Sequence, residues 1–208
     1  MIICPTITVD NPEEYSKYLD ILRSFASRIH LDCGDSEFTS RNLYPIENIH
    51  LPDELTVDLH AMFKNPIKKL ETILSLHPSL VIIHAESENI ENFLKQISQT
   101  PIKKGVAVLQ STPVSQIIGY LDELDHVLVF SGSLGKWGGN ADLRLLNKVK
   151  ELRSLKPSLE ISWDGGVNDS NIKELKSAGV DVVNVGGYIS KSENPKEAYL
   201  NLERAVST

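Results

Sequence analysis

Short strand-forming runs alternate with segments of helical period along almost the whole of this chain. The first run, IICPTITV, precedes the helical segment PEEYSKYLDILRSFASR, and a second run, IHLDC, follows it. The later runs are LTVDLHA, SLVIIHAE, KKGVAVL, DHVLVFS, LEISW and VDVVNVG. The later helical segments are PIKKLETILSLH, ENIENFLKQIS, VSQIIGYLDEL, ADLRLLNKVKELRSL, SNIKELKSAG and PKEAYLNLERAV. This pattern predicts about eight strands, each except the second followed directly by a helix.

The exception is the stretch from Asp35 to Leu55, which is rich in polar and turn-forming residues. It predicts a long loop with one short helix, and loops of this length are usually functional.

Alternating strands and helices leave two main architectures, a doubly wound open sheet and a (β/α)8 barrel. About eight units in 208 residues favour the α/β barrel, and no linker interrupts the series. We therefore expect one domain over residues 1–208, with its active site at the carboxyl ends of the strands.

Composition excludes several classes of protein. The net charge of -7 argues against a protein that works by neutralising nucleic acid or anionic lipid. The two cysteines, Cys4 and Cys33, have no metal-binding or disulfide spacing. No run of apolar residues is long enough to span a membrane, so we expect a soluble, cytoplasmic protein.

Pairs of an acid and a histidine, two residues apart, occur near the ends of three predicted strands. They are His30 with Asp32, Asp58 with His60, and His84 with Glu86; a further strand ends at Asp164. Residues i and i+2 of a strand project from the same face, so each pair points one way. Burying several ionisable groups together is costly unless a metal or mutual pairing compensates.

A metal centre is therefore our first interpretation. His30, Asp32, His60 and Asp164 suit one divalent metal ion, and zinc, iron, manganese and cobalt all fit such a set. Asp58, His84 and Glu86 are candidates for orienting those ligands. The alternative is that these are core polar residues that satisfy one another.

Glycines cluster after the last two predicted strands. Asp164 to Val167 read DGGV and Val185 to Gly187 read VGG, where barrel enzymes commonly bind phosphate through backbone N–H groups. Each glycine pair alone is equally an ordinary turn. A third segment, SGSLGKWGGN from Ser131 to Asn140, is long enough to fold over a ligand, with a flexible surface loop as the alternative.

A series of short motifs along the chain resembles the ribulose-phosphate 3-epimerase family. In order, these motifs are HLD, DLHAM, HAE, KKGVAV with STP, the glycine-rich loop, DGGV with AGVD, and the final VGG. The resemblance covers nearly the whole chain. It implies a (β/α)8 barrel of the ribulose-phosphate-binding type, with one divalent metal bound by two histidines and two aspartates. By motif these are His30, Asp32, His60 and Asp164.

The resemblance also implies an isomerase. Asp32 and Asp164 would exchange a proton with carbon 3 of D-ribulose 5-phosphate, through a metal-stabilised enediolate, to give D-xylulose 5-phosphate. Asp32 would accept the proton and Asp164 would return one to the opposite face. The implied substrate-binding and phosphate-binding residues are Thr6, His60, Gly135, Gly138, Gly139, Gly165, Gly166, Gly186 and Gly187. The family often forms homo-oligomers, and the sequence does not decide the assembly.

Several positions depart from the family pattern. The family usually has several methionines that help to close the active site. Here the stretch from Leu31 to Ser36 lacks one of them, Phe130 replaces another, and only Met62 remains. The loop that normally reads N-P-G-F-G-G-Q has Leu134 for the proline and is one residue longer, with Lys136 and Trp137 in its middle. Two alternatives therefore stay open: an epimerase of another ketose phosphate, such as a hexulose 6-phosphate, and a silent sugar-phosphate-binding protein.

Overall fold

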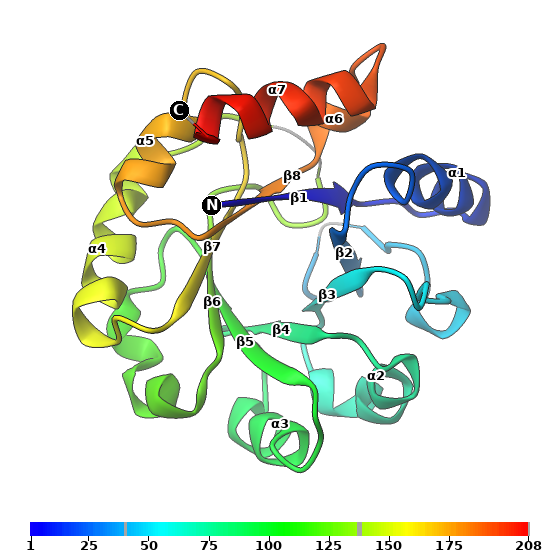
Figure 1. Ribbon diagram of the computed structural model, residues 1–208. Helices are drawn as coiled ribbons and strands as arrows, with labels where there is room; N and C mark the ends of the chain where they lie inside the picture. Colours follow the sequence, from blue (N-terminus) through cyan, green and yellow to red (C-terminus); the bar gives the residue numbers. More distant parts are fainter. Residues whose placement is uncertain (40, 137–138, 208) are drawn as a thin grey trace.

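Eight parallel strands close into one barrel in the order of the sequence, which confirms the predicted (β/α)8 architecture. The computed structural model describes residues 1–39, 41–136 and 139–207. The strands are β1 (Ile2–Ile7), β2 (Arg28–Gly34), β3 (Thr56–Met62), β4 (Leu80–His84), β5 (Lys103–Val108), β6 (His126–Phe130), β7 (Glu160–Asp164) and β8 (Val182–Val185). Figure 1 shows them around the centre of the molecule, with the helices outside.

Most of the helices lie within the predicted segments, but the short helix over Gly187–Ser190 was not predicted. The helices are α1 (Pro12–Leu22), α2 (Leu70–Leu76) after the 3-10 turn η2 (Pro66–Lys69), α3 (Ile90–Ile97), α4 (Leu146–Leu155) after η5 (Leu143–Leu145), α5 (Ile172–Ser177), α6 (Gly187–Ser190) and α7 (Pro195–Ser207). Asn11 fixes the start of α1, because its side-chain oxygen accepts a hydrogen bond from the Glu14 N–H while Pro12 occupies the first turn. None of the helices in the described ranges is both long and apolar enough to cross a bilayer.

One predicted helix is wrong. The segment VSQIIGYLDEL forms two 3-10 turns, η3 (Val114–Gln116) and η4 (Ile118–Glu123), instead of an α-helix. The two β-branched residues Ile117 and Ile118 and then Gly119 have poor helix propensity, so the segment has little intrinsic reason to continue past one turn. The loop from Asp35 to Leu55 is irregular as predicted, with the single 3-10 turn η1 (Ile46–Asn48).

The interior of the barrel is divided into an apolar and a polar part. Alternate residues of each strand face inward, and those of β4, β5 and β6 form a small apolar cluster. Its buried members are Leu80, Ile82, Ala107, Leu128 and Phe130. The larger core, which includes Trp163 and Phe93, is a separate cluster that packs the strands against the helices. The ionisable side chains are concentrated on β2, β3 and β7.

A network of charged groups occupies the interior near the amino ends of the strands. Arg28 Nε donates to both carboxylate oxygens of Asp58, at 3.1 and 2.9 Å, and its two terminal nitrogens donate to Glu160 at 2.9 and 2.8 Å. His126 lies 2.8 Å from Glu160 through Nδ1 and 2.6 Å from the Ser162 hydroxyl through Nε2. Although burial opposes the charge, contacts with Arg28 and His126 hold the pKa of Glu160 well below its usual range.

Asp58 belongs to this network and not to the layer of residues above it. It lies opposite His30 in the register of β2 and β3, whereas the next inward pair is Asp32 opposite His60. Its hydrogen-bond partner is Arg28, so the sequence-based expectation that Asp58 orients a metal ligand by direct contact finds no such contact among the described residues. Its charge still acts on His30, because it is one of the groups that raise the pKa of that ring.

We predict that Arg28→Met lowers the free energy of unfolding by about 3–5 kcal/mol, because it leaves the Asp58 carboxylate buried without a partner. Denaturant unfolding measures the change. The matched control is Arg23→Met, which removes an ion pair with Asp20 whose side chains are both more than half exposed, and a much smaller effect is expected there. Equal losses of unfolding free energy in the two variants would show that the buried Arg28 network stabilises the fold no more than an exposed ion pair does.

Candidate active site

Four predicted ligands meet at the carboxyl ends of the strands. His30 and Asp32 come from β2, His60 from β3 and Asp164 from β7, and their ligand atoms all lie within 4.8 Å of one another. His60 Nδ1 is 2.9 Å from Asp32 Oδ1. His30 Nε2 is 3.3 Å from the same oxygen and 3.6 Å from Asp164 Oδ2. The structure therefore brings this predicted set together.

The donor atoms of this cluster fit a divalent metal ion. Both ring nitrogens of His30 are buried, and neither makes a hydrogen bond with any residue that the structure describes. A buried polar atom without a partner is costly, and a metal ion would satisfy one of these nitrogens. Two imidazoles with two carboxylates form a donor set that binds zinc, iron, manganese or cobalt.

His60 is arranged to present a free lone pair to the cluster. Glu86 lies 3.2 Å from His84 Nδ1, and although burial opposes the charge of Glu86, contacts with His84 and Thr112 lower its pKa. A carboxylate there favours the tautomer of His84 with its proton on Nδ1, in which Nε2 accepts a hydrogen bond. His60 Nε2 lies 2.8 Å from that nitrogen, and in this tautomer it would donate to His84, so that His60 Nδ1 would carry the lone pair that a metal ion beside Asp32 needs. The predicted orienting role of His84 and Glu86 thus has a structural basis.

The two carboxylates of the cluster differ in their affinity for protons. Burial opposes the charge of Asp32, yet contacts with the rings of His30 and His60 hold its pKa well below the usual range. The Thr8 hydroxyl also donates to Asp32 Oδ2 at 2.6 Å. Burial, and then the charge of Asp32, raise the pKa of Asp164 to about 7. Burial lowers the pKa of His60 to about 3, so this ring stays neutral.

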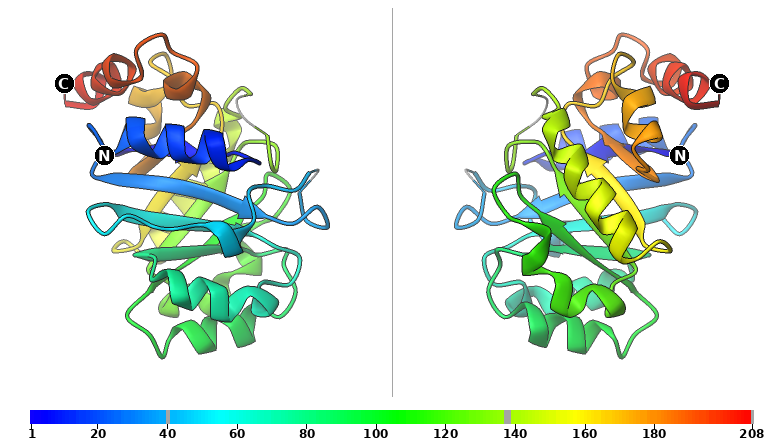
Figure 2. Two further views of the ribbon diagram at one scale, coloured as in Figure 1. Left: turned by 90° about the vertical axis from the view of Figure 1, so that its right-hand side faces the viewer. Right: turned by 90° about the vertical axis from the view of Figure 1, so that its left-hand side faces the viewer.

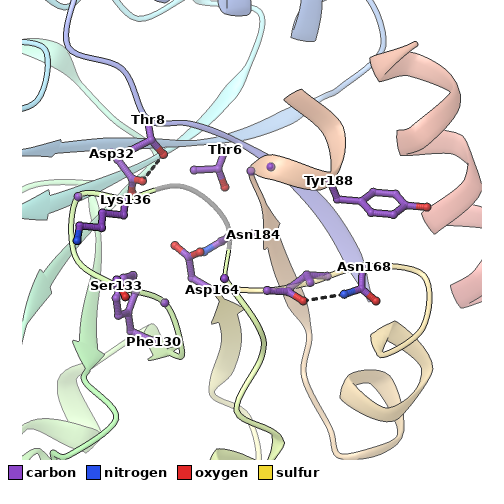
Figure 3. Close-up of a pocket in the computed structure, with 18 of the residues that line it drawn as sticks. Thr6, Thr8, Asp32, Phe130, Ser133, Lys136, Asp164, Asn168, Asn184 and Tyr188 are labelled. Atoms are coloured by element: carbon purple, nitrogen blue, oxygen red, sulfur yellow. Dashed lines mark hydrogen bonds between the residues drawn. The ribbon is translucent and has the colours of Figure 1, made fainter. Parts of the chain in front are cut away.

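A pocket opens directly above these side chains. Asp32, Asp164 and Met62 line it, together with seven of the predicted substrate-binding residues: Thr6, Gly135, Gly139, Gly165, Gly166, Gly186 and Gly187. The predicted His60 is not among the lining residues. Gly138, like Trp137, lies outside the described residues. His60 lies beneath the pocket, buried against Asp32 and Phe130. Figure 3 shows Thr6, Asp32, Asp164 and Lys136 around this space.

Gly165 and Gly166 must be glycines because the backbone of the loop after β6 lies too close to them for a side chain. Gly165 and Gly166 have φ values of 109° and 70°, and a Cβ on them would lie 2.3 Å from Gly132 N and 2.1 Å from Ala141 N. The loop from Ser131 to Asp142 therefore presses on the β7 turn at both of its ends. Two hydrogen bonds hold it there: Ser131 N donates to the Asp164 carbonyl, and Asp142 N donates to the Ser131 hydroxyl, both at 2.7 Å.

Several polar residues of the pocket were not identified from the sequence: Thr8, Ser133, Asn168, Asn184, Tyr188 and Lys191. Thr8 is the hydrogen-bond donor to Asp32, and Asn184 lies on β8 opposite Asp164. Both line the pocket and both occur inside runs that read as apolar strands. The available signal was the strand period, since Thr8 follows Thr6 and Asn184 precedes Gly186 by two residues.

Comparison with known proteins identifies the family. The family model described as "Ribulose-phosphate 3 epimerase family" matches residues 2–190. The chain is 34% identical over 189 residues to a ribulose-phosphate 3-epimerase of Helicobacter pylori, covering 86% of this chain and 87% of that one. It is 27% identical to the ribulose-phosphate 3-epimerase of Schizosaccharomyces pombe, covering 86% and 81%.

Solved structures extend the likeness of the fold. A 3-hexulose-6-phosphate synthase from Salmonella typhimurium superposes with a TM-score of 0.75 at 15% identity, over 100% of this chain and 99% of that one. A 3-keto-L-gulonate-6-phosphate decarboxylase from Vibrio cholerae gives 0.69 at 12% identity, over 100% and 97%. At such identities the likeness concerns the barrel alone. With the family match across the barrel and the close relatives taken together, the chain belongs to the ribulose-phosphate 3-epimerase family of isomerases.

Proposed function

We propose that this protein is a metal-dependent epimerase that interconverts D-ribulose 5-phosphate and D-xylulose 5-phosphate by proton transfer at carbon 3. The observation that carries the proposal is the pair of carboxylates Asp32 and Asp164, which have opposite pKa shifts and meet beside two imidazoles in one pocket. Epimerisation needs one group that removes a proton and a second that supplies one. The names of the relatives support the substrate.

His30, Asp32, His60 and Asp164 would hold one divalent ion, which is zinc, iron, manganese or cobalt. The bound ion supplies Lewis-acid stabilisation of the negative charge that develops on the substrate oxygens. The remaining steps belong to the side chains of this chain. His84 and Glu86 fix the orientation and tautomer of His60, and Thr8 fixes one oxygen of Asp32.

The two aspartates have distinct roles in one direction of the reaction. Asp32, whose low pKa keeps it ionised, accepts the proton from carbon 3. Asp164, which burial and the charge of Asp32 make the more basic of the two carboxylates, would deliver a proton to the opposite face. The roles exchange in the reverse direction, because after one turnover Asp32 carries the proton and Asp164 is ionised.

The glycines at the ends of β7 and β8 would bind the phosphate group. Gly165, Gly166, Gly186 and Gly187 line the side of the pocket next to Asp164, and peptide N–H groups without side chains can approach phosphate oxygens closely. Gly135, Gly138 and Gly139 of the β6 loop, with Thr6 and His60, complete the proposed contacts to the substrate. The substrate class is accordingly a small phosphorylated ketose.

The first prediction concerns the reaction itself. In deuterated water, D-ribulose 5-phosphate should form D-xylulose 5-phosphate with deuterium at carbon 3, and Asp164→Asn should lower turnover by about 10²–10⁴-fold. Proton and mass spectra follow both changes. Asp142→Asn is a matched control, because Asp142 lies outside the cluster, and it should keep most activity. If wild-type protein with metal gave neither product nor exchange, the pentose assignment would be wrong, and a hexulose 6-phosphate would be tested next.

The second prediction concerns the metal. After treatment with a chelator, addition of Zn²⁺ or Mn²⁺ should raise the free energy of unfolding by about 2.7 kcal/mol once free metal reaches 100 times the dissociation constant. His30→Ala should lose most of this stabilisation, because His30 supplies one of the ligands. Thermal unfolding with and without metal measures both effects. A stabilisation of equal size in His30→Ala would place the metal elsewhere.

The third prediction concerns the hydrogen bond between His84 and His60. His84→Leu removes the acceptor for the His60 Nε2–H and should weaken metal binding by about 10–100-fold. Titration calorimetry with Zn²⁺ measures the affinity directly. The control is His50→Leu, at an exposed histidine far from the cluster, which should bind as the wild type does. Unchanged affinity in His84→Leu would mean that this hydrogen bond does not orient His60.

A further inference from the structure

Asn184 is a buried amide that faces the pocket. It lies on β8, opposite Asp164 on β7 and opposite Cys4 on β1. It is 2% exposed and lines the same pocket as Asp32 and Asp164. Figure 3 shows its side chain next to that of Asp164, at the base of the pocket.

The polar atoms of this side chain have no partner in the part of the chain that the structure describes. Neither Oδ1 nor Nδ2 makes a hydrogen bond there, and the Oγ1 of Thr6 on the neighbouring strand is in the same state. An asparagine side chain offers two donors and an acceptor with two lone pairs, and buried groups of this kind are nearly always paired. Two such groups lining one pocket indicate that a ligand supplies their partners.

The position of Asn184 tells which part of a ligand it would meet. Asp164 lies beside it at the same level of the barrel, and Gly186 follows it by two residues on the same face of β8. Asn184 thus lies between the proposed site of proton transfer and the proposed phosphate site. In a 2-ketose 5-phosphate, carbon 4 is the atom between the reacting carbon 3 and the carbon that bears the phosphate.

The chemistry of the two side chains favours a neutral hydroxyl group. A hydroxyl group both donates and accepts, so it can pair with the Asn184 oxygen and nitrogen and with the Thr6 hydroxyl. A phosphate or carboxylate only accepts, and it would leave Asn184 Oδ1 without a partner. An anion at this depth would also lie close to the carboxyl group of Asp164.

We propose that Asn184, together with Thr6, binds the carbon 4 hydroxyl group of the substrate and restricts the enzyme to ketose phosphates that carry a hydroxyl group there. This inference rests on the proposed function, since it assumes a substrate that spans the two ends of the pocket. A site built to pair with a hydroxyl group discriminates strongly against an analogue without it, because the buried polar groups then stay unpaired.

The test compares wild-type enzyme and Asn184→Leu on D-ribulose 5-phosphate and on the analogue that lacks the carbon 4 hydroxyl group. Asn184→Leu should lower kcat/KM for D-ribulose 5-phosphate by about 10–100-fold and change it by less than about threefold for the analogue. A matched Asn184→Ser variant, which keeps a hydroxyl group, should recover part of the loss. Equal losses on both substrates would overturn the inference.

A second measurement separates this role from packing. Without substrate, Asn184→Leu should melt at a higher temperature than the wild type, because it removes an unpaired buried amide. A lower melting temperature together with equal kinetic losses would assign Asn184 to the structure of the barrel.

Failure of the proposed function would be recognised separately. If the wild type epimerised neither compound, the inference would be judged on binding, from the thermal stabilisation that each compound gives. Stronger stabilisation by D-ribulose 5-phosphate than by the analogue, lost in Asn184→Leu, would support the role of Asn184. Equal stabilisation by the two, or none by either, would overturn it.

Discussion

Closure of the barrel forces inward-facing side chains into a space that water does not fill, and much of that space here holds ionisable groups. The charges are tolerated because they are compensated in layers. Near the amino ends of the strands, Arg28 forms ion pairs with both Asp58 and Glu160. One layer higher, two imidazoles face two carboxylates, and the nitrogens of His30 make no hydrogen bond with the described residues. The groups of the lower layer pair with one another, whereas the upper layer has a donor set that a divalent cation would complete.

The sequence could predict the strands, most helices and the set of four ligands, because each of these depends on local period. A spacing of two residues puts His30 and Asp32 on one face whatever the rest of the chain does. The partner of Asp58 could not be predicted, because Arg28 is shared with Glu160, 132 residues away, and only closure brings them together. The need for glycine at 166 was also hidden, since it comes from the backbone of Ala141 on another loop. Asn184 was overlooked because a single polar residue hardly changes an apolar run.

The upper layer also shows how one environment gives two aspartates different properties. The Thr8 hydroxyl group donates to Asp32, and the rings of His30 and His60 lie beside it. For Asp164, burial and then the negative charge of Asp32 are the main influences, and both raise its pKa. In the proposed mechanism, the side of the pocket where a proton is removed and the side where one is returned would thus differ before any substrate binds. The chain from Glu86 through His84 to His60 extends this arrangement to a neighbouring strand, so the site depends on residues that no substrate would touch.

The loop between β6 and α4 is fastened at both ends, by Ser131 to the Asp164 carbonyl and by Ala141 against Gly166. Such fastening decides where insertions and deletions can be accommodated. A residue added at either end would displace the backbone that carries Asp164, whereas a residue added in the middle would alter only what overhangs the pocket. The resemblance described above implies one extra residue in that middle, around Lys136. A change of length there would therefore alter the loop residues that line the pocket, such as Gly135 and Lys136, while the backbone that carries Asp164 keeps its place.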